Sequence, residues 1–281
     1  MNLPRARVRR PWRLAAEASA LVIAAVVAFP LYWMVLGAFK PAGEIESTEP
    51  RPWTLSPTLD SFRRVFGQQE FGRYFLNSVV VAVAVVIASA LIAFLAATAV
   101  TRFRFRMRTT LLIMFLVAQM VPVEALTIPL FFVMRDLGQL NTLWSLILPH
   151  IAFSLPFAIW MLRGFVKAVP TALEEAACID GASRARFLWQ ILFPLVLPGL
   201  VATSVFSFIS TWNDFLFAKS FIISDISQST LPMALLVFYK PDEPDWGGVM
   251  AASTVMTIPV LVFFVLVQRR LVSGLGGAVK D

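Results

Sequence analysis

The chain has 281 residues, of which 58% are hydrophobic and only 15% are charged. A soluble domain carries about 45–50% apolar and about 25% charged residues, because its whole surface faces water. This composition excludes an ordinary soluble domain and indicates that lipid is the main solvent of the chain.

The formal net charge is +7, which would suit a nucleic-acid-binding protein if the cations lined a polar face. Lys and Arg stand instead at the ends of apolar runs, as they do in membrane proteins. The single cysteine, Cys178, and the single histidine, His150, exclude an intramolecular disulfide and a histidine-rich metal site. We therefore expect a membrane-lipid environment, no nucleic-acid partner and no metal site.

Six stretches are long and apolar enough to cross a bilayer, whose core about 30 Å thick needs about 20 helical residues. They are residues 14–39, 74–101, 109–134, 143–162, 195–218 and 247–268. The first follows a basic start, but its uncharged run of 22 residues exceeds the apolar region of a secretory signal, which has about 7–15. We expect an all-α integral membrane protein with a basic N-terminal segment (1–13), one six-span domain (14–268) and a C-terminal tail (269–281).

The distribution of Lys and Arg predicts the orientation, because these residues are retained on the cytoplasmic side of short loops. With both termini inside, the cytoplasmic segments hold 16 of the 24 Lys and Arg residues. The outer loops hold the other eight, together with ten carboxylates. We therefore expect both termini to be cytoplasmic.

The cytoplasmic connection between the fourth and fifth spans, residues 169–194, has helix signals of its own. Thr171 and Glu174 have the spacing of a capping box, Gly181 suits a left-handed helix end, and Ser183 suits the start of a second helix. The sequence predicts a helix, a tight bend and another helix. The small side chains of Ala176 and Ala177 favour a docking element; an amphipathic helix on the membrane surface is the alternative.

This connection resembles the EAA loop of binding-protein-dependent ABC transporter permeases. The motif reads Glu175-Ala176-Ala177, three residues, Gly181, nine residues, Ile191, one residue and Phe193-Pro194, with Asp180 before the glycine. The family usually has Leu where Phe193 stands. The resemblance covers nearly the whole chain and is to the carbohydrate-uptake branch, in particular the six-span subunit of the maltose-permease type, through Asn77-Ser78, Ile128-Pro129-Leu130, Trp212-Asn213-Asp214 and the segment from Arg269 to Lys280.

The resemblance implies a type I ABC importer permease fold in a bacterial inner membrane, with the loop helix docked in a cleft of a separate ATPase subunit. The ATPase-coupling residues would be Glu174, Glu175, Ala176, Ala177, Asp180 and Gly181. The partners would be a second, non-identical permease chain, two ATPase subunits and an extracytoplasmic sugar-binding protein. The chain has no Gly-x-x-x-x-Gly-Lys-Ser/Thr phosphate loop, so ATP and Mg would be used by the ATPases, and we expect this chain to bind no cofactor and to catalyse no reaction.

Polar groups inside the spans are candidates for the transport path, because an ionisable residue there costs roughly 2.5–3.5 kcal/mol on insertion. Thr203, Ser207, Ser210 and Asp214 are offset by 4, 3 and 4 positions, which would place them on one helical face. Such hydroxyls also occur where membrane helices pack, and both interpretations stay open. The candidate path residues are Gln119, Glu124, Ser207, Ser210, Asn213 and Asp214, whereas His150 is expected to be packed or interfacial.

The function expected from all this is the import of a sugar or oligosaccharide by alternating access. The same machinery importing a polyol or a glycerol phosphate ester is the nearest alternative, although an anionic substrate would favour a cation on the path and no span holds one in its middle. An intramembrane enzyme using Glu124 and Asp214 is an alternative from another class. It would leave the structured cytoplasmic loop without a role, and it lacks a motif that supplies the rest of a site.

Overall fold

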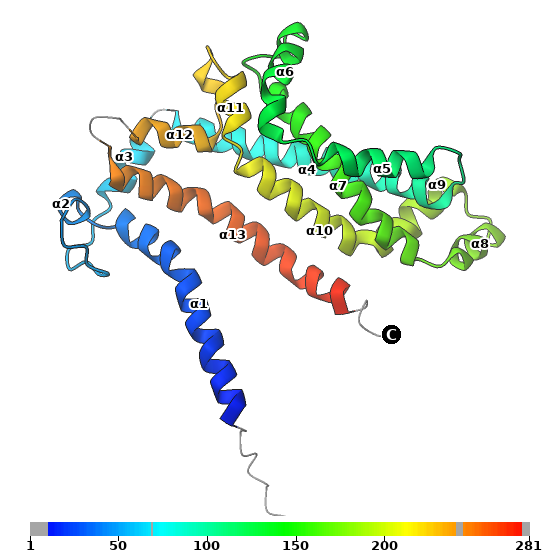
Figure 1. Cartoon of the computed structure of the whole chain (residues 1–281), viewed down its shortest axis with the longest axis horizontal. Helices are drawn as coiled ribbons and strands as arrows, with labels where there is room; N and C mark the ends of the chain where they lie inside the picture. Colours follow the sequence, from blue (N-terminus) through cyan, green and yellow to red (C-terminus); the bar gives the residue numbers. More distant parts are fainter. Residues whose placement is uncertain (1–10, 69, 240–243, 277–281) are drawn as a thin grey trace, which may run out of the picture. The chain divides into compact units, whose positions relative to one another are not determined.

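The computed structural model describes residues 11–68, 70–239 and 244–276, and every regular element among them is helical (Figure 1). The expected all-α fold is confirmed. The helices are α1 (Pro11–Ala38), α2 (Ala42–Ile45), α3 (Asp60–Gly67), α4 (Phe71–Arg102), α5 (Arg108–Ala118), α6 (Val123–Asp136), α7 (Trp144–Ala168), α8 (Thr171–Ile179), α9 (Arg184–Arg186), α10 (Phe193–Trp212), α11 (Leu216–Phe221), α12 (Leu231–Phe238) and α13 (Trp246–Gly276), with a π-helical turn at Phe187–Leu192 and a 3₁₀ turn at Ile226–Gln228.

Five helical stretches of the described chain are individually long and apolar enough to cross a bilayer. They are Ala15–Ala38, Phe71–Arg102, Trp144–Ala168, Arg184–Trp212 and Trp246–Gln268. Many of their large apolar side chains, such as Leu21 and Val27 in α1, are exposed, as expected where lipid is the solvent. Five of the six expected spans therefore appear as single helical stretches.

The third expected span, residues 109–134, is not one continuous helix. It is made of α5 and α6, which are bent by 102° at a short break. Pro122 lies at the break and has no N–H to continue the helical ladder, and it disfavours helical backbone at Val121. The described chain has six spans, as expected, if this bent pair counts as one.

The described chain divides into two compact units, of which the first comprises the residues up to Gly67 and the segment Phe238–Val255. In this unit the guanidinium of Arg64 binds both carboxylate oxygens of Asp245, at 2.8 and 3.0 Å. Gly37 in α1 lies so close to Met250 that an added Cβ would be 2.0 Å from its sulfur. The end of α1 and helix α3 are thereby held to the start of α13.

The second unit comprises Gln68–Val237 and the residues from Met256 on, and its core forms where α4, α7 and α10 pack together. Figure 1 shows these three helices with the short helix α8 at one end of them. The fully buried side chains at that end include Phe94, Leu162, Val166, Leu192 and Val196. The connection between α7 and α10 packs on this cluster through Ala177 and Phe187.

Candidate functional site

The connection between α7 and α10 forms the expected helix, bend and helix. Gly181 has φ of +77°, and the backbone N–H of Ala182 donates to the carbonyl of Ala177 at 2.8 Å, so α8 ends in a Schellman motif. The hydroxyl of Ser183 then accepts a hydrogen bond from the N–H of Arg186 at 3.2 Å and caps the next helix. The bend is thus fixed by hydrogen bonds and by a glycine in the left-handed conformation, which residues with a side chain rarely adopt.

The capping box predicted for Thr171 and Glu174 is absent. The N-cap of α8 is Pro170, and no side chain caps this end. In a capping box the glutamate bonds the N–H of the N-cap residue, and proline has none. Glu174 instead forms an ion pair with Arg102, the last residue of α4, whose Nε lies 3.6 Å from Oε2 of Glu174.

The two sides of α8 differ in what they present. Ala177 is buried in the apolar cluster, so this side faces the other helices. Exposed residues recur at the i, i+3, i+4 and i+7 positions of the opposite side: Ala172, Glu175, Ala176 and Ile179. Ile179 is 86% exposed although its loop is flanked by charged residues. The exposed side of α8 therefore presents small and apolar side chains beside one carboxylate.

Two residues of this site were missed by the sequence analysis. Ile179 had a local signal, since its helical spacing from Glu175 and Ala176 places it on their face. Arg102 had none, because it lies 72 positions before Glu174 in the sequence and only the packing of α4 brings them together. It was counted only as one cation among those that set the orientation.

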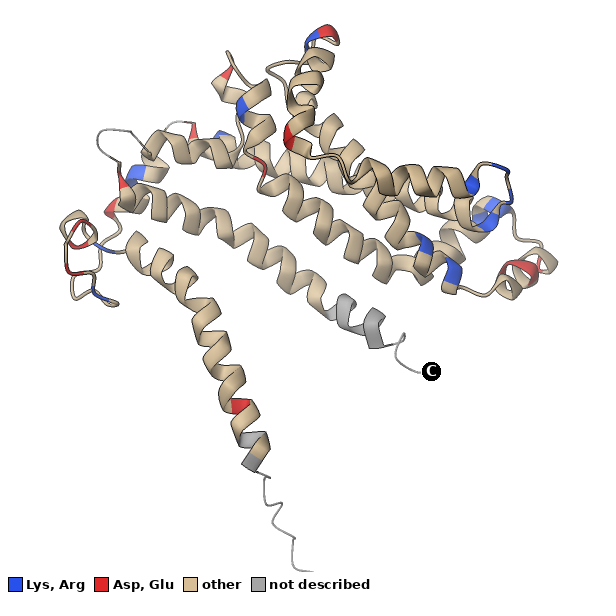
Figure 2. Ribbon diagram, in the orientation of Figure 1, with Lys and Arg blue, Asp and Glu red and all other residues tan. Residues whose placement is uncertain are grey.

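Eight cations of the second unit gather at the end where α8 lies (Figure 2). They come from the ends of α4 and α7, the start of α5, and the turn before α10. They are Arg102, Arg104, Arg106, Arg108, Arg163, Lys167, Arg184 and Arg186. This clustering is the three-dimensional form of the charge asymmetry seen in the sequence.

The candidate path residues on α10 divide into a buried and an exposed group. Ser207 is 1% exposed, and its hydroxyl lies 3.4 Å from that of Ser89 in α4, a contact of packed helices. Ser210 and Asn213 are exposed on the surface of this chain. The geometry therefore favours helix packing for Ser207 and leaves the other two side chains facing out of the chain.

Asp214 does not continue the polar face of Thr203 and Ser207, because α10 ends at Trp212. Its carboxylate oxygens accept hydrogen bonds from the N–H groups of Phe217 and Ala218, at 3.3 and 3.2 Å, and so cap α11. A carboxylate at a helix start is stabilised by unpaired N–H groups and by the helix dipole. The expected helical alignment of Asp214 was wrong.

His150 is a packed histidine, as expected. It is 5% exposed, its Nδ1 is 2.8 Å from the carbonyl oxygen of Leu146, and its ring meets that of Phe217 edge-on. Nε2 lies 4.0 Å from a carboxylate oxygen of Asp214. In the described part of the chain, no group of three or more His, Cys, Asp or Glu side chains is arranged to hold a metal ion.

Gln119 and Glu124 flank the break between α5 and α6, and both are exposed. Glu124 lies in the first turn of α6, where a negative charge is favoured by the helix dipole. These two side chains lie on different helices from Asn213. Of the six candidate path residues, four are thus exposed, Ser207 is buried and Asp214 is partly buried.

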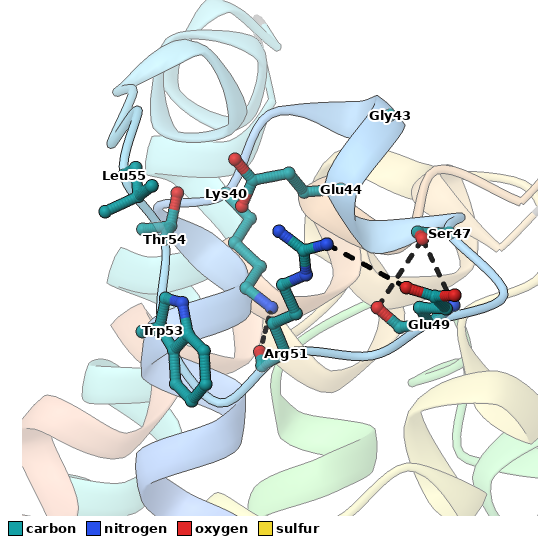
Figure 3. A pocket seen from close by; sticks show the side chains of 9 residues that line it. All are labelled: Lys40, Gly43, Glu44, Ser47, Glu49, Arg51, Trp53, Thr54 and Leu55. Carbon is teal, nitrogen blue, oxygen red and sulfur yellow. Dashed lines mark hydrogen bonds and ion pairs between the residues drawn. The ribbon is translucent and has the colours of Figure 1, made fainter.

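The connection after α1 lines a pocket of about 250 Å³ that the sequence did not indicate (Figure 3). Nζ of Lys40 donates to the carbonyl oxygen of Arg51 at 2.5 Å, which closes the loop on itself. The remaining lining includes Glu44, Glu49 and Trp53. Both charge signs and an aromatic ring face this space, so the loop is folded and polar.

Comparison with known proteins gives a consistent family. Residues 89–276 match the model of the "Binding-protein-dependent transport system inner membrane component" family. The diacetylchitobiose uptake system permease protein DasC of Streptomyces coelicolor is 40% identical over 263 residues, which cover 93% of this chain and 95% of that protein. The trehalose/maltose transport system permease protein MalG of Thermococcus litoralis is 35% identical over 273 residues, 93% of this chain and 94% of that protein.

A solved structure shares the fold. A chain of a bacterial ABC transporter involved in the import of the acidic polysaccharide alginate superposes with a TM-score of 0.79 over 95% of this chain and 99% of that chain. The two sequences are 19% identical. The fold of the described helices is therefore that of ABC importer permeases.

Proposed function

Since this chain belongs to the family of binding-protein-dependent transport system inner membrane components, we propose that it carries a neutral sugar or oligosaccharide through the path of its importer. The chain is a multi-pass permease subunit of an ABC importer of the inner membrane. An ATPase and an extracytoplasmic binding protein work with it, and ATP is hydrolysed on the ATPase. The substrate class, the coupling surface and the composition of the complex are the finer parts of this proposal.

Two observations support a neutral sugar. DasC and MalG match more than nine-tenths of this chain. Their names give diacetylchitobiose and trehalose or maltose as the sugars of their transport systems. No membrane span of this chain holds Lys or Arg in its middle, whereas a path for an anion would favour a cation there. A sugar or oligosaccharide fits both observations better than a glycerol phosphate ester.

The coupling proposal rests on the exposed side of α8, which lies at the end of the second unit where the cations gather. Glu175, Ala176 and Ile179 lie on that side, and Asp180 and Gly181 follow at the bend. We expect this surface to enter a cleft of the ATPase. Ala177 would support it from the buried side, and Glu174 would face Arg102 instead of the ATPase.

A second permease chain explains the exposed polar groups of the spans. Gln119, Glu124, Ser210 and Asn213 are uncovered in this chain, although such groups are costly against lipid. A non-identical permease would enclose them between the two chains and make them the walls of a shared path. Asp214 and Ser207 would then act by shaping helices, and two ATPase subunits would serve the pair.

The proposed orientation places α8 and both termini in the cytoplasm. The cluster of cations around α8 supports this by the positive-inside rule. The N-terminal residues Arg5, Arg7, Arg9 and Arg10 and the tail residues Ala278, Val279 and Lys280 lie outside the described residues. For these ends the segments 1–13 and 269–281 stay proposals from the sequence.

The test is ATP hydrolysis and uptake by the complex of this chain, its neighbouring permease and its ATPase, reconstituted in liposomes with the binding protein. Neutral mono- and oligosaccharides are compared with polyols and glycerol phosphate esters. Stimulation of both activities by a neutral sugar is the expected result. Stimulation only by a phosphate ester or a polyol would overturn the substrate class, and no stimulation by any ligand of a stable complex would overturn the sugar assignment altogether.

A further inference from the structure

The side chain of Arg102, at the cytoplasmic end of α4, reaches both the end of α7 and α8. Its side chain is only 8% exposed. Nη2 donates to the carbonyl oxygens of Val166 and Val169, at 3.3 and 2.8 Å, and Nε faces the carboxylate of Glu174 at 3.6 Å. One guanidinium therefore connects the end of span two, the end of span four and the coupling helix.

The contact with α7 has a clear physical cause. Helix α7 ends at Ala168, and the last carbonyl groups of a helix have no partner within it. A cation is favoured at this end of the helix dipole, and a planar guanidinium can donate to several acceptors at once. Arg102 thus caps α7 from a neighbouring helix.

The contact with α8 is an ion pair that links this helix to α4. Helix α8 follows α7 after Val169 and Pro170, and its buried residue Ala177 packs into the same apolar cluster as Val166 and Val169. Residues of α4 and of α7 both belong to this cluster, so apolar contacts place α8 at the ends of these helices. The ion pair of Glu174 with Arg102 adds a charged link to α4.

We propose that Arg102 is a positioning residue that transmits the movement of α8 to spans two and four during transport. The proposal rests on the function proposed above, in which α8 is moved by the ATPase. A push on α8 reaches α4 through Glu174 and Arg102, and it reaches the end of α7 through the two carbonyl oxygens. Glu174 and Glu175, adjacent in the motif, therefore have different partners: Glu174 faces inward to Arg102 and Glu175 faces outward.

The experiment compares Arg102→Met, Arg102→Lys and Glu174→Gln with the wild-type complex in liposomes. Arg104→Gln is the matched control, because Arg104 lies two positions further on and is exposed. Three quantities are measured on each complex: the amount of ATPase retained, the rate of ATP hydrolysis with loaded binding protein, and the substrate imported per ATP hydrolysed.

We expect Arg102→Met to retain the ATPase and hydrolyse ATP, while import per ATP falls roughly tenfold, as for the loss of charged hydrogen bonds. Glu174→Gln should fall less, since it loses only one contact, and Arg102→Lys should lie between Arg102→Met and the wild type. Because the two residues act as one link, adding Glu174→Gln to Arg102→Met should lower import per ATP no further. The control should match the wild type.

A purely structural role would lower retention, hydrolysis and import together, leaving import per ATP unchanged, and this result would overturn the proposal. Should Arg102→Met fail to assemble, Glu174→Gln decides the question, because it keeps the shape of a half-exposed side chain. Unchanged import per ATP in Glu174→Gln would then refute the link. Failure of the function itself is distinguishable, since the wild-type complex would show no substrate-dependent activity.

Discussion

The side-chain oxygen of Asn141 accepts a hydrogen bond from the backbone N–H of Ile223 at 2.7 Å. It also accepts from the N–H of Ser224 at 2.8 Å, and the N–H of Asn141 donates to the carbonyl of Phe221. The loop between α6 and α7 therefore holds the turn that follows α11. Asn77 in α4 holds the same segment further on, through the carbonyl oxygens of Ser227 and Ser229.

Two substitutions of Asn141 separate its side chain from its backbone. Asn141 has φ of +60°, which glycine adopts freely and alanine does not. Asn141→Gly loses only the side-chain hydrogen bonds, about 1–3 kcal/mol. Asn141→Ala adds about 1–2 kcal/mol of backbone strain. We expect the segment around Ile223 to be cleaved faster by protease in Asn141→Ala than in Asn141→Gly; equal rates would show that the backbone is not strained.

Gly181 should tolerate asparagine better than alanine. Its φ is +77° and an added Cβ would meet open space, so a substitution is penalised by conformation and not by collision. Alanine costs about 1–2 kcal/mol in this region, whereas asparagine is adopted there more readily. We expect Gly181→Ala to retain less ATPase in a pull-down of the complex than Gly181→Asn. Equal loss in both variants would point instead to a direct contact between the glycine and the ATPase.

Local signals predicted one part of the molecule and long-range packing determined the rest. The spans follow from hydropathy because lipid requires long apolar helices. Gly181 and Ser183 act on their own neighbours, so their roles could be read from the sequence. The break after α5 has a local cause in Pro122, whereas the position of Arg102 depends on which helices pack together. Glu174 shows how packing can override a local signal. Its spacing favoured a local helix cap, but the N-cap residue Pro170 has no N–H to bond, and Glu174 pairs with the distant Arg102 instead.

The packing of α10 on α7 should be sensitive at Gly199. A Cβ added there would lie 2.5 Å from ring carbons of Phe165, so Gly199→Ala must displace a side chain of α7. We expect a loss of about 1–3 kcal/mol, as in other overpacked interiors. Gly164→Ala is the matched control, since a Cβ at Gly164 has no atom within 4 Å. Thermal denaturation in detergent should show a lower midpoint for Gly199→Ala alone; equal midpoints would mean that Phe165 moves aside freely.

The turn at Asp225 should be insensitive to pH in the neutral range. The hydrogen bond from the hydroxyl of Ser227 lowers the pKa of Asp225 below its ordinary value of 3.8. A carboxyl with a lower pKa in the folded state stabilises that state when ionised, so this contribution is present above pH 3.8 and is lost as the pH falls through the folded pKa.

We therefore expect hydrogen exchange of the Ser227 amide, which donates to the Asp225 carboxylate, to keep constant protection between about pH 5 and 8 after correction for intrinsic rates. Protection should decline only below pH 3.8. Asp225→Asn is the control, because its amide does not titrate and its protection should not change in the acid range. A decline already at neutral pH would show that another group holds the turn.

Substitutions of Asp214 can distinguish a role in capping a helix from a role in the transport path. As the cap of α11 it needs two acceptor atoms near the N–H groups of Phe217 and Ala218, and it needs no substrate. Asp214→Asn keeps one acceptor oxygen in place, whereas Asp214→Ala keeps none and should cost about 1 kcal/mol or more.

If the cap is its whole role, Asp214→Asn imports with an apparent KM close to that of the wild type, and Asp214→Ala loses assembled protein. If the carboxylate binds sugar hydroxyls on the path, Asp214→Asn raises the apparent KM while the amount of assembled complex stays the same. The fixed geometry of both hydrogen bonds makes the first result the expected one, and uptake at several substrate concentrations measures it.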